Sequence, residues 1–95
     1  MKLSYVYILK CNDDSYYTGV TSNLDQRLFH HHSGYYKGCF THDRRPLELV
    51  YSCEFTDIQL AIDGEKQIKK WSRAKKTALI NGDYEQLPNL AKKKF

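Results

Sequence analysis

The sequence has little of what membrane-spanning, disordered or disulfide-bonded proteins need. No apolar run approaches the ~20 residues that cross a bilayer. Apolar residues make up 41% and charged residues 27%, which is usual for folded globular proteins and excludes a disordered class. The start of the chain runs into Asn12, Asp13 and Asp14 without a signal-peptide cleavage pattern. We therefore expect a cytoplasmic protein that does not associate with membranes.

Cysteine is also scarce. The three cysteines (Cys11, Cys39 and Cys53) are an odd number, lie far apart and form no C-x-x-C pair. This usage favours free thiols in a reducing compartment over a disulfide framework.

The length of 95 residues predicts one domain with a modest core. No internal repeat, low-complexity segment or linker divides the chain. We expect the domain to occupy residues 1–83. Residues 84–95, with Pro88 and three lysines, are expected to form a loosely docked basic tail.

The charge is basic, with 15 Lys and Arg against 11 Asp and Glu, for a net charge of +4. The basic residues cluster in three places: Lys66, Lys69, Lys70, Arg73, Lys75 and Lys76; Arg44 and Arg45; and Lys92, Lys93 and Lys94. Solvated helix faces would explain any one cluster. Taken together, the clusters favour nucleic acid as the partner.

Periodicity and turn residues predict the order ββαβαα, an α/β fold of the α+β type. We expect a three-stranded antiparallel sheet flanked by three helices. The expected strands cover 3–11, 16–21 and 47–55. The expected helices run from Ser22 or Asn23 to about Ser33, from Asp57 to about Trp71, and from Ser72 to about 81–82.

The register of the first hairpin decides which tyrosines meet. A two-residue turn would place Tyr7 and Tyr17 on opposite faces of the sheet. A loop with an odd number of residues, such as Asp13–Ser15, places them on the same face. We expect the odd loop, with Tyr7 opposite Thr21 and Cys11 opposite Tyr17.

The third strand alternates almost cleanly in polarity. Its apolar residues, expected to share one face, are Leu47, Leu49, Tyr51, Cys53 and Phe55.

Glu65 is a carboxylate where packing favours an apolar residue. At about 100° per residue, Ile58, Ala61, Ile62 and Ile68 form the inward stripe of the second helix, and Glu65 falls near its centre. Burial of a carboxylate is costly unless a cation meets it. The cation is either a lysine or arginine in a structural ion pair, or a metal such as Mg²⁺ or Mn²⁺.

Arg27 and His31 are four residues apart and therefore neighbours on one helix face. An arginine can grip two phosphate oxygens, and a histidine can donate to phosphate or exchange a proton. A solvated arginine and a packed histidine are the simpler interpretation for each alone; beside Glu65 we favour function. A zinc site from His30, His31, His32, Cys39 and His42 matches no common structural spacing.

Five segments in order resemble the GIY-YIG nuclease superfamily, closest to its small stand-alone bacterial branch. The segments are YVYIL from Tyr5, YTGVT from Tyr17, RLFHH from Arg27, RRPLELVY from Arg44 and EKQIK from Glu65. The resemblance covers about residues 3–81. Two positions depart from the family pattern: Tyr5 stands where the family name has glycine, and Val20 where many relatives have lysine.

The resemblance implies a metal-dependent endonuclease that uses Mg²⁺ or Mn²⁺ to hydrolyse phosphodiester bonds in nucleic acid, with DNA as the expected substrate. It implies that Tyr7 and Tyr17 line the site, one helping to deprotonate water, that Arg27 stabilises phosphate, that His31 assists and that Glu65 holds the cation. Arg27, Lys10 and the metal could lower a phenol pKa enough for this role. Further substrate-binding residues are expected to be Gly19, Lys10, Thr41, Arg44, Arg45, Lys69 and Asn81. Relatives act in DNA repair and recombination and usually carry separate DNA-binding modules, so a protein partner that supplies targeting is a further expectation.

An alternative is a non-catalytic nucleic-acid-binding module. It would use the basic helix 65–76 and the loop 34–46, where Tyr35, Tyr36 and Phe40 could stack on bases. The carboxylate of Glu65 favours the nuclease, because binding alone needs no carboxylate among phosphates. Nothing positive supports a pure protein-interaction domain.

Overall fold

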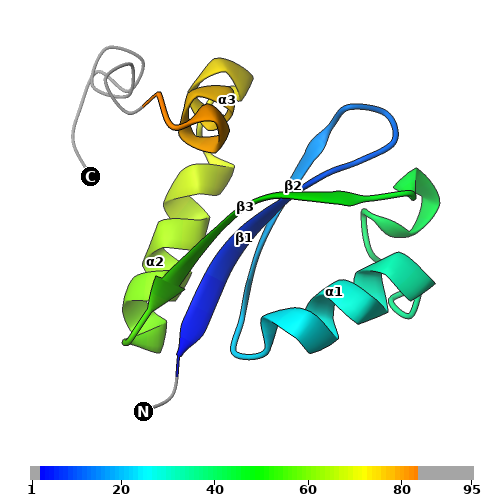
Figure 1. Ribbon diagram of the computed structural model, residues 1–95, viewed down its shortest axis with the longest axis horizontal. Coiled ribbons are helices and arrows are strands. Elements are labelled where there is room, and N and C mark those ends of the chain that lie inside the picture. The colour runs from blue at the N-terminus through cyan, green and yellow to red at the C-terminus, as the bar shows by residue number, and fades with distance from the viewer. Residues whose placement is uncertain (1–2, 84–95) are drawn as a thin grey trace.

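The computed structural model describes residues 3–83 as a three-stranded antiparallel sheet with helices on both faces (Figure 1). The elements are β1 (Ser4–Lys10), β2 (Tyr16–Thr21), α1 (Leu24–Ser33), the 3-10 turn η1 (His42–Arg44), β3 (Glu48–Phe55), α2 (Ile58–Lys69) and α3 (Arg73–Asn81). The strand order is β2-β1-β3, so β1 is central. The predicted fold class and element order are confirmed. The expected basic tail lies outside the described residues, and no helix among those described could cross a membrane.

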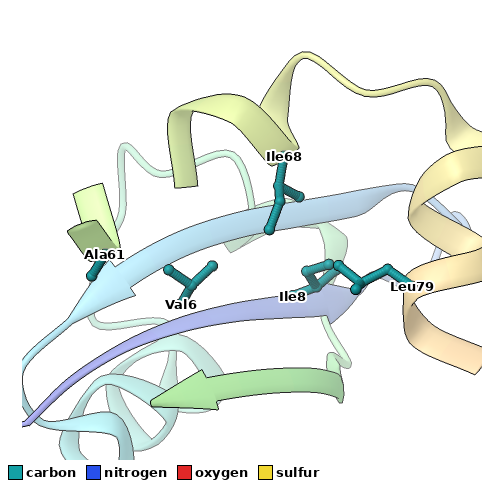
Figure 2. Packing of buried hydrophobic residues seen from close by; sticks show 5 residues of the cluster. All are labelled: Val6, Ile8, Ala61, Ile68 and Leu79. Atoms are coloured by element: carbon teal, nitrogen blue, oxygen red, sulfur yellow. The ribbon is translucent and has the colours of Figure 1, made fainter. Parts of the chain in front are cut away.

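The central strand β1 separates two apolar clusters, because successive side chains point to opposite faces of a sheet. On one face lie Val6, Ile8, Ala61, Ile68 and Leu79 (Figure 2). On the other lie Tyr7, Leu9, Cys11 and Leu47, with Leu24 and Leu28 packed against them. Helices α2 and α3 therefore cover one face of the sheet, and α1 covers the other.

The β1–β2 turn has three residues, as expected, but it lies one residue earlier in the chain than predicted. It consists of Asn12–Asp14, and the Cys11 amide donates to the Ser15 carbonyl at 2.8 Å. Asp14 has a φ of 67°. A three-residue hairpin loop needs a left-handed residue at its end, and aspartate tolerates that conformation. The left-handed conformation of Asp14 therefore determines where the turn lies in the chain and how the residues of β1 and β2 pair.

The shifted turn changes the pairing of the hairpin by two positions. Tyr7 lies opposite Gly19 instead of Thr21, and Tyr17 lies opposite Leu9 instead of Cys11. The expected pairs were wrong, but the shift is even. The prediction that Tyr7 and Tyr17 share a face is therefore confirmed; their ring centroids are 6.3 Å apart.

A bulge at Val50 breaks the alternation predicted for the third strand. Ile8 pairs with Tyr51 and Leu9 with Leu49, which leaves Val50 as the extra residue. The single face expected for this strand was therefore wrong. The residues that face α2 are Tyr51, Cys53 and Phe55, and those that face α1 are Leu47 and Leu49.

The helix ends follow the predicted signals. The side chains of Asn23, Asp57 and Ser72 cap the three helices, and Gly34 and Gly82 close two of them with a φ of 77°. In α2, Ala61 and Ile68 are buried as expected, but Ile58 is 49% exposed, which corrects its place in the inward stripe. Ile58 is the first residue of the helix, where the chain has only begun to pack on the sheet.

Candidate active site

The phenol of Tyr7 packs directly over Gly19 on the neighbouring strand. A Cβ atom at Gly19 would lie 2.4 Å from the Tyr7 hydroxyl oxygen and 2.5 Å from its Cζ. Only glycine allows this approach. Gly19 was expected to bind substrate; it is buried and instead makes room for the phenol.

His31 joins β1 to the loop after α1 through two buried hydrogen bonds. Its Nε2 lies 2.9 Å from the Tyr7 hydroxyl and its Nδ1 3.0 Å from Thr41 Oγ1. All three residues are at most 2% exposed. Thr41 was expected to touch substrate; at 1% exposure its hydroxyl lies behind His31 and is satisfied by protein groups.

Tyr17 and Arg27 complete the group at its half-buried side. The Tyr17 ring meets the His31 ring edge-on, with centroids 5.3 Å apart. The Arg27 guanidinium lies close enough to Tyr7 for its charge to act on the pKa of that phenol, and it lies 5.5 Å from the centre of the Tyr36 ring. Four of the predicted site residues thus lie together on the α1 face of the sheet.

Burial dominates the protonation states of this group. It raises the pKa of Tyr7, which the charge of Arg27 only partly offsets, and it raises the pKa of Tyr17, as does the neighbouring Tyr7. Burial, assisted by Arg27, lowers the pKa of His31 to about 4. At neutral pH both phenols are therefore protonated and His31 is neutral.

Lys10 does not supply the expected charge near the phenols. Its ammonium lies 3.6 Å from the Asp14 carboxylate. Because Arg27 is outweighed by burial, a phenol of this site can act as a base only when a further cation is present.

Glu65 lies on the other face of the sheet. It is 7% exposed, and α2 places it four residues after Ala61 and three before Ile68, both of which pack on the α2 face. Lys69 Nζ lies 2.6 Å from its carboxylate. The prediction that Glu65 is buried is confirmed, and a lysine is its cation in the structure.

The donor set around Glu65 suits a hydrated Mg²⁺ or Mn²⁺. No group of three or more His, Cys, Asp or Glu side chains gathers in residues 3–83 as a cage for an ion. Mg²⁺ commonly keeps several waters and binds through one or two carboxylates plus substrate phosphate. On the same face, the buried Thr18 hydroxyl has no hydrogen-bond partner in the described chain, which leaves an oxygen for a water of such an ion. The residues fit the cation, and α2 packs on the edge strand β2 that also carries Tyr17.

Two predicted substrate-binding arginines hold the loop 34–46 in place. Arg44 bonds the Asp13 carboxylate at 3.1 Å and the Phe40 carbonyl at 2.7 Å. Arg45 bonds the His42 carbonyl at 2.8 Å, and its guanidinium covers Gly34. Lys69 and Asn81 are exposed, and their contact with substrate stays a prediction.

The basic stretch 65–76 is not one helix, as the alternative function assumed. Helix α2 ends at Lys69 and α3 begins at Arg73. Lys75 is buried, with its ammonium 3.8 Å from the centre of the Trp71 ring, so it cannot reach a phosphate.

From the sequence, Cys39 was considered only as a zinc ligand and Tyr36 only as a ring that stacks on bases. Thr41 Oγ1 donates to Cys39 Sγ at 3.4 Å. The Tyr36 hydroxyl bonds His30 at 3.1 Å, and its ring packs on His31 with centroids 5.5 Å apart. The dense aromatic content of loop 34–46 was the available signal.

Comparison with known proteins gives consistent matches. The GIY-YIG catalytic domain matches residues 3–78. A UPF0213 protein of Syntrophus aciditrophicus is 42% identical and covers 92% of this chain and 100% of its own. A UPF0213 protein of Natronomonas pharaonis, NP_0776A, is 42% identical and covers 80% and 88%. The solution NMR structure of the UPF0213 protein BH0048 from Bacillus halodurans is 41% identical, covers 83% of each chain and has a TM-score of 0.56. These relatives' names state no activity.

Proposed function

The chain belongs to the GIY-YIG catalytic domain family, and from that premise we propose that it is a divalent-metal-dependent endonuclease that hydrolyses phosphodiester bonds in DNA. The observation that carries the proposal is the cluster of Tyr7, Tyr17, Arg27 and His31 on the α1 face of the sheet, with the buried carboxylate of Glu65 on the α2 face. A phosphate bound along β2 would be within reach of the cluster on one face of the sheet and of the Glu65 carboxylate on the other.

Arg27 would bind the scissile phosphate. It is half-buried and has no carboxylate partner among the ion pairs of the described residues, so its positive charge is available to an anion. A planar guanidinium can donate two parallel hydrogen bonds to phosphate oxygens. Stabilisation of charge that develops on phosphate is the main electrostatic contribution to such a reaction.

Tyr17 is the phenol that would contact the attacking water. Tyr7 has no exposed surface, so it would act by orienting its neighbours, whereas Tyr17 is half-buried and keeps part of its surface accessible to water. His31, which is neutral at pH 7, would hold Tyr7 in place.

Glu65 would hold the cation. When bound, Mg²⁺ or Mn²⁺ supplies positive charge that offsets charge developing on the phosphate and lowers the pKa of nearby acids. Lys69 would leave the carboxylate and become free to contact the nucleic acid.

The test is cleavage of labelled duplex, flapped and single-stranded DNA, and of RNA, with Mg²⁺, with Mn²⁺ or with EDTA. We expect cleavage that requires metal, is lost in Glu65→Gln and persists in Asp63→Asn, an exposed acid of the same helix. No metal-dependent cleavage of any substrate would refute the proposal. Cleavage that survives Glu65→Gln would refute the metal assignment.

A second candidate is binding without catalysis. Phe29 and Tyr35 are 68% and 65% exposed, and the Tyr35 ring stacks on His30 with centroids 4.1 Å apart. A rigid exposed ring of this kind can stack on a base. Binding in EDTA, abolished by Tyr35→Ala and without cleavage in any metal, would favour this function.

A further inference from the structure

The hydrogen bonds around His31 have a direction that the chemistry of each group determines. The Tyr7 hydroxyl is fully buried, and a buried O–H needs an acceptor. Its hydrogen-bond partner among residues 3–83 is His31 Nε2, and the nearby Arg27 carries donors only, so His31 Nε2 must accept the hydrogen bond from Tyr7.

That assignment defines the rest of the chain of hydrogen bonds. A neutral imidazole with a free Nε2 carries its proton on Nδ1, and Nδ1–H then donates to Thr41 Oγ1 at 3.0 Å. The Thr41 hydroxyl in turn donates a hydrogen bond to Cys39 Sγ at 3.4 Å. The opposite direction would leave the Tyr7 proton buried without an acceptor.

The Tyr17 phenol and the Cys39 thiol are also close enough for each to affect the pKa of the other. Burial by itself raises the pKa of Cys39, but hydrogen bonds from Thr41, Tyr17 and the backbone outweigh it and lower the pKa. The thiol at the end of the chain of hydrogen bonds from Tyr7 is therefore also a neighbour of the second phenol.

We propose that Thr41 and Cys39 are positioning residues, which hold His31 in the Nδ1–H tautomer and aim the hydroxyl proton of Tyr17 at the Cys39 sulfur. The Tyr17 oxygen then keeps its lone pairs for a water on the open side. The consequence for catalysis rests on the proposed endonuclease function, whereas the tautomer of His31 does not.

The tautomer can be measured on the full chain without metal or substrate. We expect ¹⁵N NMR of histidine-labelled protein at pH 7 to show His31, assigned by its loss in His31→Gln, with a protonated Nδ1 and an unprotonated Nε2. An Nε2–H form, or two tautomers in fast exchange, would overturn the proposal even if the protein cleaves DNA. The Nδ1–H form in a protein that cleaves nothing would support the positioning network and refute only the endonuclease.

Variants test the two positioning residues separately. Thr41→Val keeps the shape but removes the acceptor, so that either Nδ1–H or the Tyr7 hydroxyl lacks a partner; we expect a mixture of the two tautomers and a kcat about tenfold lower or more with little change in KM. Thr41→Ser should restore both. Cys39→Ala should lower kcat more than Cys39→Ser, and Cys53→Ala, a thiol on the α2 face, should change nothing. An unchanged tautomer and kcat in Thr41→Val would overturn the proposal, and if that variant does not fold the wild-type spectrum still decides.

Discussion

The substitution Gly19→Ala adds one methyl group at the tightest contact of the site. An ideal Cβ would lie 2.4 Å from the hydroxyl oxygen, 2.5 Å from Cζ and 2.9 Å from Cε1 of Tyr7. Because nonbonded carbon atoms prefer about 3.5–4.0 Å, the ring must move by about 1 Å. The Tyr7–His31 hydrogen bond at 2.9 Å would then exceed hydrogen-bonding distance.

The cost of Gly19→Ala follows from these two effects. Overpacking of a dense core costs about 1–3 kcal/mol. A buried hydroxyl left without its partner costs about 1–3 kcal/mol more. A total of about 2–6 kcal/mol would lower the melting temperature by about 4–8 °C for each kcal/mol in a domain of this size, and the displaced phenol should reduce cleavage more than it reduces DNA binding.

Thermal unfolding by circular dichroism and single-turnover cleavage would check both effects. Gly38→Ala is the matched control, because a Cβ there meets no atom within 4 Å. A Gly19→Ala protein with wild-type melting temperature and cleavage rate would refute the close packing of Tyr7 on Gly19 and the orienting role given to Tyr7.

Three further predictions follow from the charges of the site. The pKa of His31 is about 4 in the folded protein, below its ordinary value of 6.5, so the unfolded chain binds more protons between these two pH values. The free energy of unfolding, measured by chemical denaturation, should therefore decrease as the pH falls from about 6.5 to 4. In His31→Gln the free energy of unfolding should depend less on pH over this range. Arg27→Lys should lower the cleavage rate about 100-fold without loss of fold, because an ammonium cannot replace the guanidinium fork, and a smaller effect than threefold would exclude direct phosphate contact. With about three phosphate contacts, DNA affinity measured by fluorescence anisotropy in EDTA should fall about 40-fold between 50 and 200 mM salt, whereas a flat titration would exclude the basic surface.

Several features of the site could be predicted from the sequence because they depend on local pattern. The parity of the hairpin placed Tyr7 and Tyr17 on one face, since every odd loop gives that result. Helical periodicity placed Glu65 among buried residues, and the helix caps marked the ends of the helices.

Other features depend on tertiary structure and could not be predicted. The position of the turn in the chain depends on the left-handed conformation of Asp14. Which face of the sheet each side chain of β3 points to depends on a bulge at Val50, which an alternating pattern does not reveal. The roles of Thr41 and Cys39 depend on how loop 34–46 packs against α1. Arg44 and Arg45 were expected to bind substrate from their charge alone, although their guanidinium groups are engaged in holding that loop.

The central claim is that one phosphate meets groups from both faces of the edge strand β2. Anomalous diffraction from crystals soaked with Mn²⁺ and a short DNA oligonucleotide tests this claim most directly. We predict a single Mn²⁺ about 2.1 Å from a carboxylate oxygen of Glu65, with Lys69 displaced and a phosphate between the ion and Arg27. A Mn²⁺ bound away from Glu65, or a phosphate that contacts neither Arg27 nor Tyr17, would contradict the account.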